Sequence, residues 1–362
     1  MKIAFYGSSL LSSYWNGAAT YYRGILKGLA AHGHEITFYE PDAFDRQSNR
    51  DIDPPEYATS VVYPATQEGL RAVLAEARHA DVVVKASGVG VFDDELIAGI
   101  VEHARPGALK IFWDVDAAAT LDEIRADPAH PIRAALPQLD MVLTYGGGPP
   151  VVETYEALGA ARCIPVYNAV DPETHHPVAP DHRFACDLAF LGNRLPDREA
   201  RVEQFFLAAA AALPEQRFLI GGSGWHDKHM PANVRHLGHV GTADHNAFNC
   251  TPRAVLNIAR DSMAAVGFSP ATRVFEAAGA GACLITDYWE GIEQFLIPGE
   301  EVLVAHTGQD VADLLAGLTT ERARAIGDAA RRRVLAEHTY ELRAKQVDDL
   351  LRTHAAAEQV AA

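Results

Sequence analysis

The chain begins with a strand–helix–strand pattern that starts at Ile3-Ala4-Phe5-Tyr6-Gly7. This pattern ends at His32-Gly33-His34-Glu35-Ile36-Thr37-Phe38-Tyr39. The segment between them carries apolar side chains at helical spacing, at Tyr22, Ile25, Leu26 and Leu29. Gly33 ends this predicted helix, because glycine readily takes the left-handed conformation beyond a helix end. The sequence therefore predicts a strand over 3–6, a helix over 18–32 and a strand over 35–39.

The same alternation continues along the chain. Further strands are predicted at 82–85, 109–113, 141–144, 188–192, 217–221, 254–258, 282–286 and 302–304. Helices are predicted at 67–78, 93–103, 198–213, 270–278, 310–318 and over most of 320–353. The polar stretch 45–55 is a predicted loop, and 171–182 a predicted linker. Strands that alternate with helices form parallel sheets with helices on both faces, so we expect α/β domains.

Composition excludes several classes of protein. The 362 residues leave room for two domains, and no apolar run is long enough to span a membrane. The apolar start is too short for a signal peptide, so a cytoplasmic location is predicted. Lys and Arg number 31 against 48 Asp and Glu, a net charge of −17. A nucleic-acid partner, which requires a basic face, is not expected.

The cysteines and the first loop disfavour two further classes, disulfide-rich proteins and nicotinamide oxidoreductases. Cys163, Cys186, Cys250 and Cys283 are far apart, so four buried free thiols are predicted. The loop 7–12 reads GSSLLS and lacks the glycine spacing of dinucleotide-binding proteins. Glu40 ends the second strand but lies farther on than the acidic residue of that motif, so a nicotinamide oxidoreductase is disfavoured.

Several segments resemble the GT-B glycosyltransferases. Asn16-Gly17-Ala18-Ala19-Thr20-Tyr21-Tyr22 and the turn 32–36 are similar to the opening of these enzymes. Later blocks resemble the CgeB-like (spore-maturation type) family, at 112–121 (FWDVDAAATL), 145–150 (YGGGPP), 166–172 (VYNAVDP), 190–198 (FLGNRLPDR), 273–282 (RVFEAAGAGA) and 298–301 (PGEE). The blocks follow in order over nearly the whole chain.

The resemblance implies a GT-B fold, in which two Rossmann-like doubly wound domains face each other across a cleft. We expect an acceptor-binding domain at 1–175 and a nucleotide-sugar donor-binding domain at 183–335. The helix and tail at 336–362 are expected to return to the N-terminal domain. A nucleotide-diphosphate sugar is the expected co-substrate, with no cofactor.

Two arginines and a helix start are predicted to bind the donor diphosphate, whose negative charge grows as it leaves. Arg194 and Arg198 follow a predicted strand, and Arg198 falls where related enzymes carry a basic residue; solvated surface arginines are the alternative. Ser269-Pro270 predicts a capped helix start whose amides near Thr272 and Arg273 suit phosphate.

The resemblance assigns Glu276 to the donor ribose, whose hydroxyls donate hydrogen bonds to this carboxylate in related enzymes. His239 and Val240 fall where family members present backbone groups to the nucleobase. Gly222 and Gly17 complete the predicted donor residues, although Gly17 fits a simple turn equally well. Many retaining enzymes carry a second Glu where this chain has Phe268, which weakens any inference about the sugar or the stereochemistry.

The acceptor is predicted on N-terminal loops. Asp114 and Asp116 follow an apolar strand and are candidates for the catalytic base. A helix cap from Ala117 onward explains Asp116 equally well. Tyr145, Gly146 and Gly147 are predicted to line the acceptor side.

No metal site is predicted. His226-Asp227-Lys228-His229 has no second ligand cluster near in sequence and fits a polar loop. The predicted function is a metal-independent, hexosyltransferase-type glycosyltransferase that acts on a small-molecule, glycan or protein acceptor. A nucleotide-sugar epimerase on the same fold and a non-catalytic partner of an active transferase are the alternatives.

Overall fold

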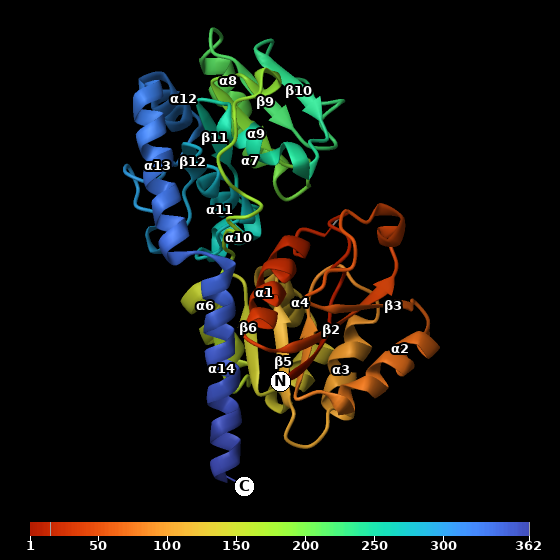
Figure 1. Cartoon of the computed structure of the whole chain (residues 1–362). Helices are drawn as coiled ribbons and strands as arrows, with labels where there is room; N and C mark the ends of the chain where they lie inside the picture. The colour runs from red at the N-terminus through yellow and green to blue at the C-terminus, as the bar shows by residue number, and fades with distance from the viewer. Residues whose placement is uncertain (15, 362) are drawn as a thin grey trace. The chain divides into compact units, whose positions relative to one another are not determined.

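The computed structural model describes residues 1–14 and 16–361 and divides into two compact units. Unit 1 comprises Met1–Tyr167 together with Tyr340–Ala362, and unit 2 comprises Asn168–Thr339. The predicted linker at 171–182 thus belongs to unit 2. Each unit is built around one parallel sheet (Figure 1). Among the described residues, no helix is both long and apolar enough to cross a membrane.

Unit 1 contains a seven-stranded sheet in the order β3-β2-β1-β4-β5-β6-β7. Its strands are β1 Lys2–Tyr6, β2 Glu35–Asp42, β3 Thr59–Pro64, β4 Val82–Ala86, β5 Leu109–Asp114, β6 Met141–Thr144 and β7 Cys163–Pro165. Its helices are α1 Ala19–Ala31, α2 Gln67–Leu74, α3 Asp93–His103, α4 Ala117–Ala126, α5 Pro131–Ala135, α6 Gly148–Ala157 and α14 Tyr340–Ala361.

Unit 2 contains a six-stranded sheet in the order β10-β9-β8-β11-β12-β13. Its strands are β8 Leu188–Leu191, β9 Phe218–Gly221, β10 Val234–Gly238, β11 Ala254–Asn257, β12 Leu284–Asp287 and β13 Leu303–Ala305. Its helices are α7 Glu199–Val202, α8 Ala208–Ala212, α9 His245–Cys250, α10 Asp261–Val266, α11 Thr272–Gly279, α12 Gly308–Gly317 and α13 Thr320–Glu337, with a π-helical turn, Glu203–Leu207, between α7 and α8.

Both sheets are doubly wound, as predicted. The chain starts in the middle of each sheet, builds outward to one edge and then crosses to the other side of the first strand. Ligands of such folds bind at the carboxyl ends of the strands, where the winding reverses. This point lies between β1 and β4 in unit 1 and between β8 and β11 in unit 2.

The strands that the sequence failed to predict lie at sheet edges. β3, β7 and β10 each pair on one side only. β10 is only partly buried along its length, so its sequence VRHLG lacks the apolar run of a central strand. Three of the four predicted thiols are buried, whereas Cys250 is partly exposed; all four are free.

Two glycines of α1 allow α14 to pack closely on it within unit 1. A Cβ at Gly24 would lie 2.3 Å from the ring of Tyr340, and one at Gly28 would lie 2.4 Å from the Cβ of Ala344. His34 adds a buried contact to Asp348, with 2.8 Å between Nε2 and Oδ1. Small residues at this interface let the two helix backbones approach.

We predict that Gly28→Leu destabilises unit 1 by about 1–3 kcal/mol, because the added side chain overpacks the helix contact. The measurement is urea-induced unfolding followed by circular dichroism. Gly17→Ala is the matched control, since a Cβ at Gly17 meets nothing within 4 Å. Equal stability of the two variants would contradict this account of α14.

Candidate functional site

Glycines bring together the loops that follow three strands of unit 2. The Gly192 amide donates to the Gly221 carbonyl at 3.0 Å, and the Gly222 amide donates to the Gly238 carbonyl at 2.7 Å. Gly222 has φ 119°, and a Cβ there would lie 2.2 Å from the Gly192 oxygen. A Cβ at Gly192 would in turn lie 2.9 Å from Nη1 of Arg198. Backbone therefore packs directly beside the arginine at the carboxyl edge of the sheet.

Arg198 and Arg273 place two positive charges at this edge with unsatisfied donors. Burial lowers the pKa of Arg198, and the nearby charges of Arg260 and Arg273 lower it further, against the carboxylate of Asp197. Among the described residues, Nε of Arg198 and Nη1 of Arg273 are buried without a hydrogen-bond partner. Buried donors in this state are costly, so they favour an anionic ligand.

Glu276 lies on the buried face of α11, one turn beyond Arg273. Its Oε2 is 3.9 Å from Nη2 of Arg273, and its Oε1 is 3.7 Å from Nε2 of His175. Burial alone would raise the pKa of Glu276, but the charges of Arg273 and His175 outweigh it and lower the pKa. The residue is therefore a carboxylate that can accept hydrogen bonds.

His245 completes this group. Burial, followed by the charge of Arg273, lowers the pKa of His245 to about 4, against the nearby carboxylate of Glu276. One ligand atom from each of His175, His245 and Glu276 lies within 4.8 Å of the others, a set that could hold a metal ion. Spacing along the chain carries no signal for either histidine, because the three residues are far apart in the sequence.

The start of α11 differs from the prediction. The helix begins at Thr272 after Ala271, which makes no side-chain cap bond, so Ser269 is not the cap. Ser269 Oγ donates instead to the Gly267 carbonyl at 2.9 Å. Phe268 takes a left-handed φ of 47°, and its amide donates to Glu290 at 2.6 Å. This anchored turn delays the helix by two residues relative to Pro270.

Arg194 is engaged elsewhere in its loop. Its guanidinium lies 2.7 Å from Glu199 and 2.7 Å from Asp227. Both carboxylates raise the pKa of Arg194, so its charge is already balanced. This geometry favours a role in ordering the loop, and the diphosphate assignment of Arg194 stays a prediction.

Of the two residues predicted to face the nucleobase, His239 is exposed and Val240 is buried.

In unit 1, Asp114 is buried among hydrogen-bond donors. Its oxygens accept from the Ser87 hydroxyl at 2.7 Å, the Asp116 amide and the Thr120 hydroxyl at 3.0 Å each, and the Tyr155 hydroxyl at 2.5 Å. Burial raises the pKa of Asp114 in spite of these bonds. Complete burial favours a positioning role for Asp114, and its catalytic assignment stays a prediction.

Asp116 differs from Asp114, because it is partly exposed and lines a cavity of about 260 Å³. The cavity is bordered by polar side chains from β4, α3, α4 and the segments next to them, among them Lys85, Ser87, Asp93, Glu123 and His130. Asp116 precedes α4 but makes no side-chain cap bond, so the capping alternative is wrong. A hydroxylated ligand would find both donors and acceptors in this cavity.

The predicted acceptor residues Tyr145, Gly146 and Gly147 form the backbone turn that follows β6. The Tyr145 amide donates to the Asp114 carbonyl at 3.2 Å, which joins the two loops. Gly147 has φ 95°, and a Cβ there would lie 2.1 Å from Val151, so only glycine fits this turn. Gly146 is buried next to it, whereas Gly17 is exposed.

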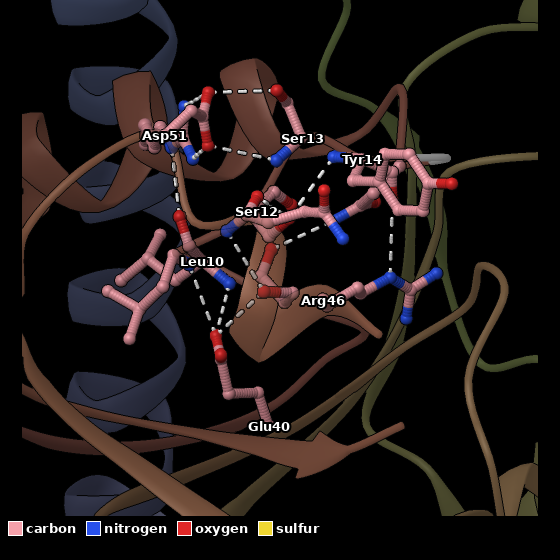
Figure 2. A network of polar contacts seen from close by, with 12 residues as sticks. Leu10, Ser12, Ser13, Tyr14, Glu40, Arg46 and Asp51 are labelled. Carbon is pink, nitrogen blue, oxygen red and sulfur yellow. Dashed lines mark hydrogen bonds and ion pairs between the residues drawn. The ribbon is translucent and has the colours of Figure 1, made fainter. Parts of the chain in front are cut away.

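Glu40 organises the first loop of unit 1, as Figure 2 shows. Its Oε2 accepts from the amides of Leu10 at 2.5 Å and Leu11 at 3.2 Å and from the Ser9 hydroxyl at 3.1 Å. Arg46, also buried, donates to the carbonyl of Tyr14 at 3.5 Å. Glu40 thus holds a loop, so it cannot act as the ribose-binding acid of a nicotinamide enzyme.

Comparison with known proteins identifies the architecture. Residues 198–349 match a family model described as glycosyl transferase-like. Sucrose-phosphate synthase from Thermosynechococcus elongatus aligns with a TM-score of 0.72 at 15% identity, over 99% of this chain and 100% of that chain. HepE from Anabaena, in complex with UDP and glucose, aligns with a TM-score of 0.70 at 11% identity, over 97% of this chain and 99% of that chain.

A glycosyltransferase involved in avilamycin A biosynthesis aligns with a TM-score of 0.63 at 18% identity, over 98% of each chain. No curated protein matches the sequence. The chain has the GT-B fold. The narrower CgeB-like assignment stays a prediction, since the matching family model carries the broader description.

Several of the predicted donor-binding residues lie close together in unit 2. Unit 2 brings Arg198, Arg273 and Glu276 together, with Thr272 as the first residue of α11. Asp287, at the end of β12, was missed by the sequence analysis and supports this edge. Its buried Oδ2 lies 2.6 Å from Nη2 of Arg201, and both carboxylate oxygens accept from the Ala259 amide.

We predict that Arg201→Ala lowers the free energy of unfolding by about 3–5 kcal/mol at neutral pH, because it leaves Asp287 charged and buried without its partner. Burial already raises the pKa of Asp287, and the loss of Arg201 would raise it further. A raised carboxyl pKa in the folded state costs stability as pH rises. The deficit should therefore shrink on acidification to about pH 5.

The measurement is urea unfolding at both pH values, with Arg217→Ala as the control at a side chain that is 71% exposed. A deficit that does not change with pH would contradict the role given to Asp287.

Proposed function

We propose that the chain is a glycosyltransferase that binds a nucleotide-diphosphate sugar in unit 2 and transfers the sugar to an acceptor bound in unit 1. The observation that carries the proposal is the pair of partly buried guanidinium groups of Arg198 and Arg273, each with one buried nitrogen that lacks a hydrogen-bond partner, beside the Glu276 carboxylate. Two cations suit a diphosphate, and a carboxylate suits the two hydroxyls of a ribose.

The chemistry follows from these charges. As the bond from the anomeric carbon to the leaving oxygen breaks, negative charge develops on the diphosphate. Arg198, Arg273 and the amides at the uncapped start of α11 would stabilise that charge, so transfer needs no metal ion. Such preorganised charge would have no purpose in a non-catalytic partner protein, which disfavours that alternative.

UDP is the nucleotide that we propose first. The structure of HepE is known in complexes with UDP and with UDP-glucose. The structure of an α-glucosyltransferase of similar fold is known in complex with UDP and DNA. These relatives share little sequence identity with the chain, so the sugar is proposed only as a hexose. For the acceptor we propose a hydroxylated molecule in the cavity beside Asp116, which would orient or deprotonate the attacking hydroxyl.

We expect UDP to raise the melting temperature more than ADP, GDP, CDP or dTDP, because ligand binding stabilises the folded state.

Arg198→Ala and Glu276→Gln should each weaken UDP binding about 10- to 100-fold, the effect of losing a hydrogen bond to a charged group. Isothermal titration calorimetry measures this, with the exposed Arg332→Ala as control. Unchanged affinity in both site variants would overturn the donor site.

We expect Asp116→Asn to slow transfer from UDP-glucose by about 10²–10⁴-fold without changing the affinity for UDP, as for loss of a general base. The assay is UDP release in the presence of a panel of hydroxylated acceptors. Asp122→Asn, on the same helix and 71% exposed, is the matched control. Equal rates for the two variants would remove Asp116 from the mechanism.

A further inference from the structure

His175, His245 and Glu276 converge from three separate parts of unit 2. His175 follows the β-bridge residue Val170, His245 begins α9, and Glu276 lies on α11. Each residue directs one ligand atom into a space in which the three atoms lie within 4.8 Å of one another. The side chains of His175 and Glu276 are each 11% exposed, so the group is enclosed yet reachable.

The imidazole of His175 is also held from outside the group. Nδ1 of His175 lies 2.9 Å from the Thr174 hydroxyl, which leaves Nε2 facing Glu276. Histidines that ligate metals characteristically have their second nitrogen fixed by a hydroxyl, carbonyl or carboxylate, because this sets the tautomer and the ring orientation.

The spacing fits a small transition-metal ion. Zinc lies about 2.0–2.2 Å from nitrogen and oxygen ligands, so neighbouring ligand atoms of a tetrahedral site are about 3.4 Å apart. The separation of His175 Nε2 and Glu276 Oε1 is 3.7 Å, close to this value. Movements of about 1 Å in the side chains would bring the remaining pairs of ligand atoms to the spacing of a tetrahedral site.

The ligand types select among metals. Two imidazoles and one carboxylate suit Zn²⁺, whereas Mg²⁺ and Ca²⁺ prefer sites made of oxygen atoms. Three protein ligands leave a fourth position for water or another molecule. We propose that His175, His245 and Glu276 form a Zn²⁺ site. The proposal goes beyond the glycosyltransferase function, which needs no metal.

The site shares Glu276 with the donor ribose. A zinc ion on Oε1 would occupy the carboxylate that the ribose hydroxyls need, so Zn²⁺ and UDP compete; this second step rests on the proposed function. Arg273, 3.9 Å from Oε2 of Glu276, opposes the ion by charge and favours the diphosphate. Arg273→Gln should therefore strengthen Zn²⁺ binding while it weakens UDP binding, two changes of opposite sign.

The direct test is calorimetric titration of the whole chain with Zn²⁺ after treatment with a chelator. We expect one high-affinity ion per chain, and a loss of about 100-fold or more in the double variant His175→Ala/His245→Ala. The matched control is His176→Ala/His226→Ala, which removes two exposed histidines of the same unit. Equal binding by the two double variants would overturn the site.

X-ray absorption spectroscopy of the zinc complex separates this site from the free thiols. Only nitrogen and oxygen neighbours are expected, and a sulfur neighbour would overturn the assignment, because a cysteine thiol would then be a ligand. UDP titration in the presence of chelator tests the donor site independently of the metal. Added Zn²⁺ should weaken UDP binding at least about 10-fold in the natural chain and leave it unchanged in His175→Ala/His245→Ala.

Discussion

Both sheets are parallel, and the strands of a parallel sheet all end at the same edge. This constraint gathers loops that are far apart in the sequence. In unit 2 it brings the loops after β8, β9 and β10 into direct backbone contact, with Gly222 where no side chain would fit. In unit 1 it joins the loops after β5 and β6 through Asp114 and Tyr145. The candidate donor and acceptor residues depend on these edges for their positions.

The charges at the two edges differ in how they are balanced. Unit 2 keeps one nitrogen each of Arg198 and Arg273 buried without a hydrogen-bond partner, although burying a charged group without its full set of partners is costly. Unit 1 instead surrounds the buried Asp114 with donors and leaves Asp116 open to a cavity. The first arrangement suits an anion that supplies the missing acceptors. The second suits an acceptor whose hydroxyl must be oriented before it reacts.

A single carboxylate connects the two uses that we propose for unit 2. Glu276 faces Arg273 with one oxygen and His175 with the other. Coordination of a zinc ion and hydrogen bonding to a ribose draw on the same lone pairs, so one excludes the other. Metal availability would then set how much of the protein can bind the proposed donor. The fold needs no additional domain for such control, because the two histidines already meet at Glu276.

The sequence by itself determined the α/β class, most of the central strands and the place of Glu276 on an apolar helix. Helical and strand periodicity is local, and a lone carboxylate among apolar residues is visible without a structure. Only the tertiary structure decided that Arg194 is paired with Glu199 and Asp227, that Asp114 is buried, and that His175 and His245 meet at Glu276. These outcomes depend on contacts between distant segments, for which spacing along the chain carries no signal. The packing of α14 on α1 is of the same kind, since it depends on Gly24 and Gly28 facing residues more than three hundred positions away.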